Sequence, residues 1–173
     1  AGYFARQIPV RAVATYPDGW QAASAMRPES VDGSTYVYQQ TDYDTLVDSP
    51  VFAGKYFQAH KLTSRAHLNI VADNSKYLKP RKSQLAKHAK LVKEAEALFG
   101  SHPYDRYDCL LALTDEMGSI GIEHHRSSEN GVNREYFNDW DDGPGRRGLL
   151  PHEVVHAWDG KYRRPQGMWT PDF

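Results

Sequence analysis

Residues 152–156, His-Glu-Val-Val-His, constrain the fold of this chain more than any other stretch of its sequence. Two histidines four residues apart lie on one face of an α-helix, about one turn from each other. Apolar residues flank the stretch on both sides, which indicates that the helix is largely buried. We therefore predict a buried helix from Leu149 to about Tyr162, where an Arg-Arg-Pro sequence ends it.

The three polar residues of this stretch have the chemistry of a zinc hydrolase. On a helix, His152 and His156 can bind one Zn²⁺ ion at about 2.0–2.1 Å. Glu153 lies off that face, yet it is close enough to act as general base on a water molecule whose pKa the metal lowers. Burying two histidines and a carboxylate together is costly unless they surround a metal. The sequence therefore predicts a Zn²⁺ cofactor.

A zinc site needs a third protein ligand, and the sequence limits its source. The metzincin pattern requires a glycine and a histidine where Asp159 and Tyr162 stand, so this pattern does not apply. The other common solution is a glutamate from a later helix, but the residues after Trp158 contain neither Glu nor His. We expect the third ligand to lie beyond Phe173 and the isolated chain to be inactive.

The rest of the sequence predicts a β-rich first part and a mixed second part. Residues 7–16 and 34–40 have the β-branched and aromatic composition of strands, with Asp-Gly turns nearby. Residues 67–73 and 105–115 are short apolar runs, which predict two buried strands. Residues 80–99 carry apolar side chains at three- and four-residue spacing, which predicts an amphipathic helix with a solvated lysine face.

Composition excludes several classes of partner. The 21 Lys and Arg residues nearly balance the 22 Asp and Glu residues, so no strong field attracts nucleic acid or an anionic membrane. No apolar run approaches the roughly 20 residues of a membrane helix. The single cysteine, Cys109, lies in an apolar run and is predicted to be a buried thiol. A peptide is the substrate that the H-E-x-x-H motif favours, because this motif is typical of metalloproteases.

Three stretches together resemble the glycyl aminopeptidase family of bacterial and archaeal metallopeptidases, which carry a C-terminal PDZ domain. HEVVHAWDGKYRRP (152–165) is similar to the zinc-helix signature of that family. GIEHHRSS (121–128) is similar to its upstream G-x-E-H motif. DYDTLVDSPVFAG (42–54) is similar to the junction between its N-terminal β domain and its thermolysin-like catalytic domain.

The resemblance implies an α+β fold with a mixed β-sheet and packed helices. Residues 1–57 would form the end of the N-terminal β domain and the junction. Residues 58–173 would form the N-terminal half of a thermolysin-like catalytic domain of the gluzincin class. The third ligand, an oxyanion-stabilising tyrosine and the PDZ domain are expected beyond Phe173. A truncated domain of this kind exposes apolar surface, so we expect the chain to self-associate.

The resemblance also implies an activity and a set of site residues. The activity is a zinc-dependent aminopeptidase that releases N-terminal Gly or Ala, with His152 and His156 as zinc ligands and Glu153 as general base. Two alternatives are a catalytically incomplete domain, either peptide-binding or structural, and an endopeptidase of the thermolysin type. An endopeptidase is disfavoured because the charge of Glu123 does not help an extended substrate that lacks a free amine.

Glu123 matches the carboxylate of the family's strand motif, where it would bind the α-ammonium group of the substrate. Gly121 and His124 are the other candidate substrate-binding residues of this strand. Two alternatives remain open. In the first, Glu123 is a surface residue paired with Arg126 or His125. In the second, His124 and His125 are ordinary strand or loop residues.

Overall fold

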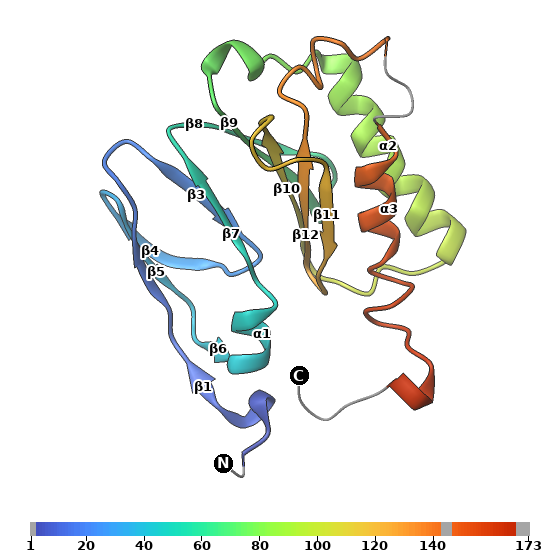
Figure 1. The fold of residues 1–173 in the computed structure, drawn as a ribbon. Helices are drawn as coiled ribbons and strands as arrows, with labels where there is room; N and C mark the ends of the chain where they lie inside the picture. Colours follow the sequence, from blue (N-terminus) through green and yellow to red (C-terminus); the bar gives the residue numbers. More distant parts are fainter. Residues whose placement is uncertain (1–2, 143–146, 169–173) are drawn as a thin grey trace.

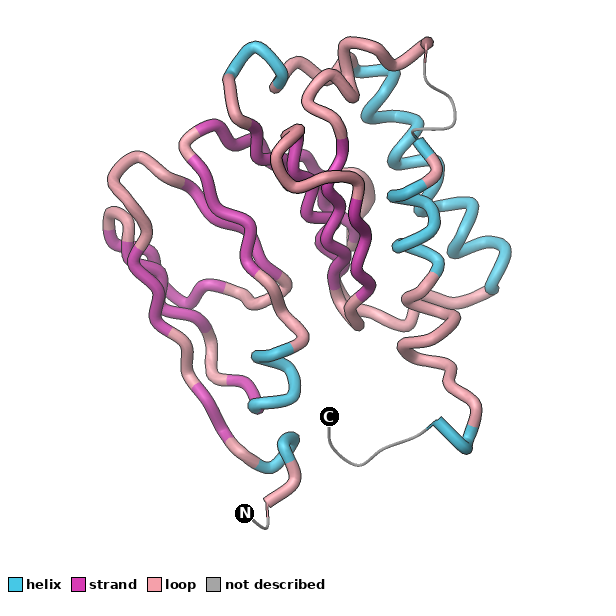
Figure 2. Tube along the Cα trace, viewed as in Figure 1, coloured by secondary structure: helices cyan, strands magenta, loops and turns pink. Residues whose placement is uncertain are grey.

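Three layers stack side by side in the computed structural model of the chain, which describes residues 3–142 and 147–168. A β-rich layer from residues 3–54 lies on one side, a five-stranded sheet in the middle, and two helices on the other side (Figure 1). Figure 2 shows the same arrangement by secondary structure, with strands in the first two layers and the two longest helices in the third. The α+β class that the sequence predicts is confirmed.

The first layer consists of short strands in small sheets. Its elements are η1 (Ala5–Gln7), β1 (Pro9–Val10), β2 (Val13–Thr15), β3 (Gln21–Ser24), β4 (Pro28–Asp32), β5 (Thr35–Tyr38), β6 (Thr41–Asp42), α1 (Tyr43–Val47) and β7 (Val51–Gly54). The strand predicted over 34–40 is confirmed as β5. The strand pattern predicted over 7–16 is also confirmed, but the structure divides it into two strands, because β1 pairs with β6 whereas β2 pairs with β5.

The predicted junction contains helix α1 and strand β7. The Asp42 side chain caps α1 by accepting a hydrogen bond from the Thr45 N–H at 2.8 Å. Strand β7 then pairs back onto β3, so the chain is still within the first layer at Gly54. It enters the central sheet at Tyr56, next to the predicted domain boundary between residues 57 and 58.

The central sheet is mixed, in the order β11-β12-β10-β9-β8. Its strands are β8 (Tyr56–Lys61), β9 (Ala66–Ala72), β10 (Tyr107–Leu113), β11 (Ile120–Glu123) and β12 (Ser127–Val132). The middle strands β9, β10 and β12 run parallel, and the edge strands β8 and β11 run antiparallel to their neighbours. Every residue of β10 is buried, because β3 and β7 pack on one face of the sheet and the helices cover the other.

Helix α2 (Lys82–Phe99) connects β9 to β10, after a short turn of helix η2 (Ser75–Tyr77). The amphipathic helix predicted over 80–99 is thus confirmed. Gly100 caps its C-terminal end, with a φ of 62° in the left-handed conformation that glycine adopts most easily. The chain finishes its described part with α3 (Leu149–Val155) and η4 (Gln166–Met168).

Helix α3 is shorter than predicted. It ends at Val155, so the predicted continuation to about Tyr162 is wrong. The backbone N–H of Lys161 bonds to the carbonyl of His156 at 3.2 Å, which closes a wide turn in place of further helix. Gly160 makes this turn possible with a φ of 107°. The buried Ala157 and Trp158 extend the apolar pattern past the helix and misled the sequence prediction.

The hydrophobic core lies between the central sheet and the helices. It includes Leu68 and Leu111 from the sheet and Val154 and Trp158 from α3 and its end. Cys109 is fully buried, as predicted, and burial raises the pKa of its thiol to about 12. No helix in the described part of the chain is long and apolar enough to cross a membrane.

Candidate metal and substrate site

Helix α3 brings the two histidine rings of the HEVVH stretch together. The Nε2 atoms of His152 and His156 are 3.1 Å apart, and the ring planes stand at 84°. Two nitrogens bound to one tetrahedral zinc at 2.0–2.1 Å lie about 3.3–3.4 Å from each other. The pair therefore fits two ligands of a single zinc ion. Leu150 and Val154 are buried in the core and hold α3 against β11 and β12.

The ring of His156 is fixed by the turn that ends α3. Its Nδ1 lies 2.9 Å from the carbonyl oxygen of Asp159, which can only accept a hydrogen bond. The proton of the neutral ring is therefore on Nδ1, and the lone pair on Nε2 faces His152. A metal-binding histidine commonly has its other nitrogen held in this way. The wide turn at Gly160 thus contributes to the site, because it places the Asp159 carbonyl.

Glu153 lies close to both His156 and strand β11, and only 4% of it is exposed. Burial raises the pKa of its carboxyl group, the two histidines oppose this rise, and the nearby charge of Glu123 adds to it. A carboxylate with a raised pKa is a better proton acceptor near neutral pH. Its position and its pKa both suit the general base that the sequence predicts.

Glu123 is the last residue of β11, and its carboxylate turns toward helix α3. Ligand atoms of Glu123, Glu153 and His156 all lie within 4.8 Å of one another. Glu123 forms no ion pair with Arg126 or His125, and all three residues belong to the described part of the chain. The alternative of a surface ion pair is therefore not observed. Two carboxylates and two imidazoles converge at one place.

Gly121 allows strand β11 to approach helix α3 closely. A methyl group at this position would overlap the carboxylate of Glu153 and would stand 2.7 Å from Cδ1 of Leu149. The predicted substrate-binding residue Gly121 therefore has a clear steric role in the site: it leaves room for Glu153.

We expect the Gly121→Ala substitution to lower the free energy of unfolding by about 1–3 kcal/mol, the usual cost of overpacking. Urea unfolding followed by circular dichroism measures this change. Gly54→Ala is the matched control, because a methyl group at Gly54 in β7 would meet its nearest neighbour at 3.6 Å, an ordinary contact. Equal losses of stability for the two variants would contradict the close approach at Gly121.

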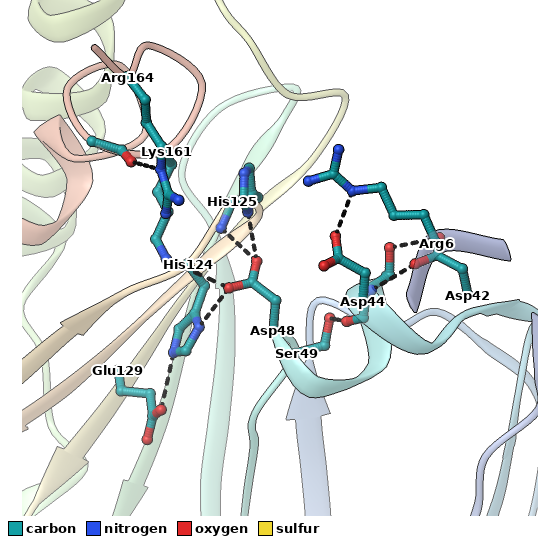
Figure 3. Close-up of polar contacts among 12 residues, drawn as sticks. Arg6, Asp42, Asp44, Asp48, Ser49, His124, His125, Glu129, Lys161 and Arg164 are labelled. Carbon is teal, nitrogen blue, oxygen red and sulfur yellow. Dashed lines mark hydrogen bonds and ion pairs between the residues drawn. The ribbon is translucent and has the colours of Figure 1, made fainter. Parts of the chain in front are cut away.

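The two histidines after Glu123 contact carboxylates of the protein (Figure 3). His124 Nδ1 lies 3.2 Å from Oδ1 of Asp48, and its Nε2 lies 3.0 Å from Oε1 of Glu129. Burial lowers the pKa of His124, but the bonds to the two carboxylates outweigh it and raise the pKa above its usual value. Both ring nitrogens are already engaged, which favours a structural role over the substrate contact that the sequence predicted.

Asp48 is the residue of this region that sequence reasoning missed. It accepts hydrogen bonds from both the backbone N–H and Nδ1 of His125, each at 2.9 Å. These contacts hold the pKa of the Asp48 carboxyl group well below its usual range, against the effect of burial. Asp48 is 77 residues away from His125 in sequence. An acidic residue in the junction was visible, but no local pattern indicates such a distant partner.

The fold is similar to that of an aminopeptidase N family protein, of an LTA4 hydrolase and of an M1 zinc metallopeptidase. An aminopeptidase N family protein from Idiomarina loihiensis superposes with a TM-score of 0.73 at 21% identity, over 93% of this chain and 29% of that protein. Yeast LTA4 hydrolase in complex with bestatin gives 0.59 at 14% identity, over 88% and 22%. The M1 zinc metallopeptidase from Deinococcus radiodurans gives 0.51 at 13% identity, over 88% and 34%. The chain thus spans about a third or less of these proteins.

Two models of one peptidase family match parts of the sequence. The Peptidase M61 N-terminal domain matches residues 1–55, and M61 glycyl aminopeptidase matches residues 145–173. The two matches confirm the resemblance to the glycyl aminopeptidase family, at both ends of the chain and in the family's order. No curated protein matches the chain in sequence.

Proposed function

We propose that the protein is a zinc-dependent aminopeptidase and that this chain supplies two zinc ligands, the general base and an amine-binding carboxylate. The observation that carries the proposal is the convergence of His152, His156, Glu153 and Glu123 between α3 and the end of β11. The match to the M61 glycyl aminopeptidase family and the fold shared with zinc metallopeptidases support it. Release of N-terminal Gly or Ala is part of the proposal.

His152 and His156 would hold the metal through their Nε2 atoms. Bound zinc would supply Lewis acidity, which lowers the pKa of a water molecule and polarises the carbonyl group of the scissile peptide bond. The Asp159 carbonyl keeps His156 in the tautomer whose Nε2 is free to bind. We propose that the third protein ligand comes from a segment outside these 173 residues, since no Glu or His follows Trp158.

Glu153 would transfer the proton. Its carboxylate accepts a proton from the water molecule that attacks the scissile carbonyl carbon. When the carbon–nitrogen bond breaks, Glu153 returns this proton to the nitrogen of the leaving amine, so that the carboxylate is regenerated. Burial of the side chain supports this role, because few solvent molecules compete for the proton.

Glu123 would bind the protonated α-amine of the substrate. A carboxylate and an ammonium group attract each other strongly in a partly desolvated cleft. Strand β11 pairs only with β12 among the described strands, so its other edge is available to pair with an extended peptide. A substrate that lies along this edge with its amine at Glu123 would be cut near its N-terminus, which distinguishes an aminopeptidase from an endopeptidase.

We expect the zinc-loaded full-length protein to cleave a peptide with a free N-terminus about 10- to 100-fold faster than its N-acetylated form, the range for one charged hydrogen bond. The ratio of kcat/KM for the two peptides measures this preference. The Glu123→Gln variant is the matched test, because it removes the charge and should lower kcat/KM for the free peptide only.

Two outcomes would change the proposal. Equal rates for the two peptides would favour an endopeptidase and remove Glu123 from its assigned role. Binding of the free peptide without cleavage, in protein shown to contain zinc, would favour a catalytically incomplete peptide-binding domain.

A further inference from the structure

We propose that Asp48 is a positioning residue that fixes the amine-binding carboxylate of Glu123 and the metal-binding imidazole of His156 relative to each other. This inference rests on the proposed function, which gives Glu123 and His156 their roles. Asp48 belongs to neither group of site residues. It follows helix α1 in the junction, and its carboxylate contacts one segment after β11 and another after α3 (Figure 3).

The carboxylate of Asp48 has a separate set of partners at each oxygen. Oδ2 accepts hydrogen bonds from the backbone N–H and from Nδ1 of His125, both at 2.9 Å. Oδ1 lies 3.2 Å from Nδ1 of His124 and 3.6 Å from the ammonium nitrogen of Lys161. One side chain therefore joins three residues from two segments that are more than 30 positions apart in sequence.

The first segment leads to Glu123. His124 follows Glu123 directly, and its backbone N–H bonds to the carbonyl of Ser127 at 3.0 Å, which closes the turn between β11 and β12. Asp48 contacts both histidine rings and one backbone N–H of this turn. The end of β11, from which the Glu123 side chain projects, is thereby fixed to the junction.

The second segment leads to His156. The backbone N–H of Lys161 bonds to the carbonyl of His156 at 3.2 Å, and the same wide turn provides the Asp159 carbonyl that holds His156 Nδ1. The ammonium group of Lys161 anchors this turn to Asp48. A shift of Lys161 would therefore move the group that orients the imidazole of His156.

The charges of this cluster balance one another in a site with little solvent. Asp48, Glu129, His124 and Lys161 have side chains that are 10%, 23%, 12% and 11% exposed. With His124 protonated, two negative charges face two positive charges. Asp48 is the member that contacts both segments, so removing its charge leaves the buried His124 and Lys161 without full compensation, and both segments would reorganise rather than stay in place.

The experiment compares Asp48→Asn with Asp44→Asn in the full-length protein. Asp44 is the matched control because it lies on α1, four residues earlier, and pairs with the exposed Arg6 at 3.0 Å. Two quantities are measured on folded protein: the Kd for Zn²⁺, by competition with a chelating dye, and the ratio of Kd values for a free and an N-acetylated peptide. Thermal unfolding is recorded for each variant.

We expect Asp48→Asn to weaken zinc binding by roughly 10- to 100-fold, as for other residues that orient a metal ligand, and to reduce the preference for the free amine. Asp44→Asn should change neither quantity. A purely structural role would lower the unfolding temperature of Asp48→Asn and leave both quantities at their wild-type values in the folded protein, which would overturn the proposal.

The Lys161→Met variant keeps the proposal testable if Asp48→Asn does not fold. It breaks only the contact to the turn after α3, so zinc binding should weaken while the preference for the free amine is retained. Unchanged zinc binding in this variant would overturn the proposal. A wild-type protein that binds no zinc and shows no amine preference would overturn the proposed function as well, so the two failures are distinguishable.

Discussion

Replacing Glu153 by glutamine is expected to lower kcat for peptide hydrolysis by about 10²- to 10⁴-fold, the usual contribution of a general base. Glutamine has nearly the same shape as glutamate and fits the space beside Gly121, but its amide does not accept a proton at neutral pH. The fold and the histidine pair should therefore be preserved. The measurement is steady-state hydrolysis of a free-amine peptide, together with the zinc content of the same sample.

The control for this variant is Glu116→Gln, because Glu116 is exposed and lies outside the convergence of side chains at α3. It should keep wild-type activity. Full activity of Glu153→Gln at normal zinc content would contradict the role of Glu153 as general base and would require another proton acceptor. Loss of zinc in Glu153→Gln would show that the carboxylate also supports the metal.

The second large effect is expected for removal of a metal ligand. We expect His156→Ala to weaken zinc binding by more than the roughly 100-fold that loss of a supporting residue causes, and to abolish hydrolysis with it. This variant loses both the Nε2 atom beside His152 and the ring that the Asp159 carbonyl orients. Elemental analysis after dialysis and a chelator competition assay measure the effect.

The matched control here is His102→Ala, since His102 is an exposed loop residue. Zinc stoichiometry should stay at the wild-type value in this variant. If His156→Ala and His102→Ala retain equal amounts of zinc, the metal is bound elsewhere and the proposed site is wrong. Binding of Co²⁺ in place of Zn²⁺ gives an independent check, because its absorption spectrum reports the number and type of ligands.

The sequence predicted those helices and strands that are determined by the pattern of their own apolar side chains. Helix α2 lies where the spacing of apolar residues indicates, and strands β9 and β10 lie where short apolar runs indicate. The histidine pair is adjacent because a four-residue spacing on a helix leaves few alternatives. The family resemblance identified Glu123 as a site residue, but its proximity to Glu153 is known only from the structure, because no local rule places a strand residue against a helix 30 positions later in the chain.

The features that sequence reasoning missed depend on distant partners or on a change of backbone direction. Strands β1 and β2 separate because each pairs with a different strand. Helix α3 ends early because of the turn at Gly160, although the apolar pattern continues through Trp158. The role of Asp48 requires knowing that the junction, the β11–β12 turn and the turn after α3 meet in space.

The close approach at Gly121 also limits how this protein can change over time. The carboxylate of Glu153 occupies the volume that any side chain at position 121 would need. A larger residue there could be accommodated by a shorter acid at position 153, but that exchange would draw the carboxylate away from the imidazole pair. Positions 121 and 153 are therefore coupled: a change at one requires a change at the other, and no such pair of changes leaves the reaction as it is.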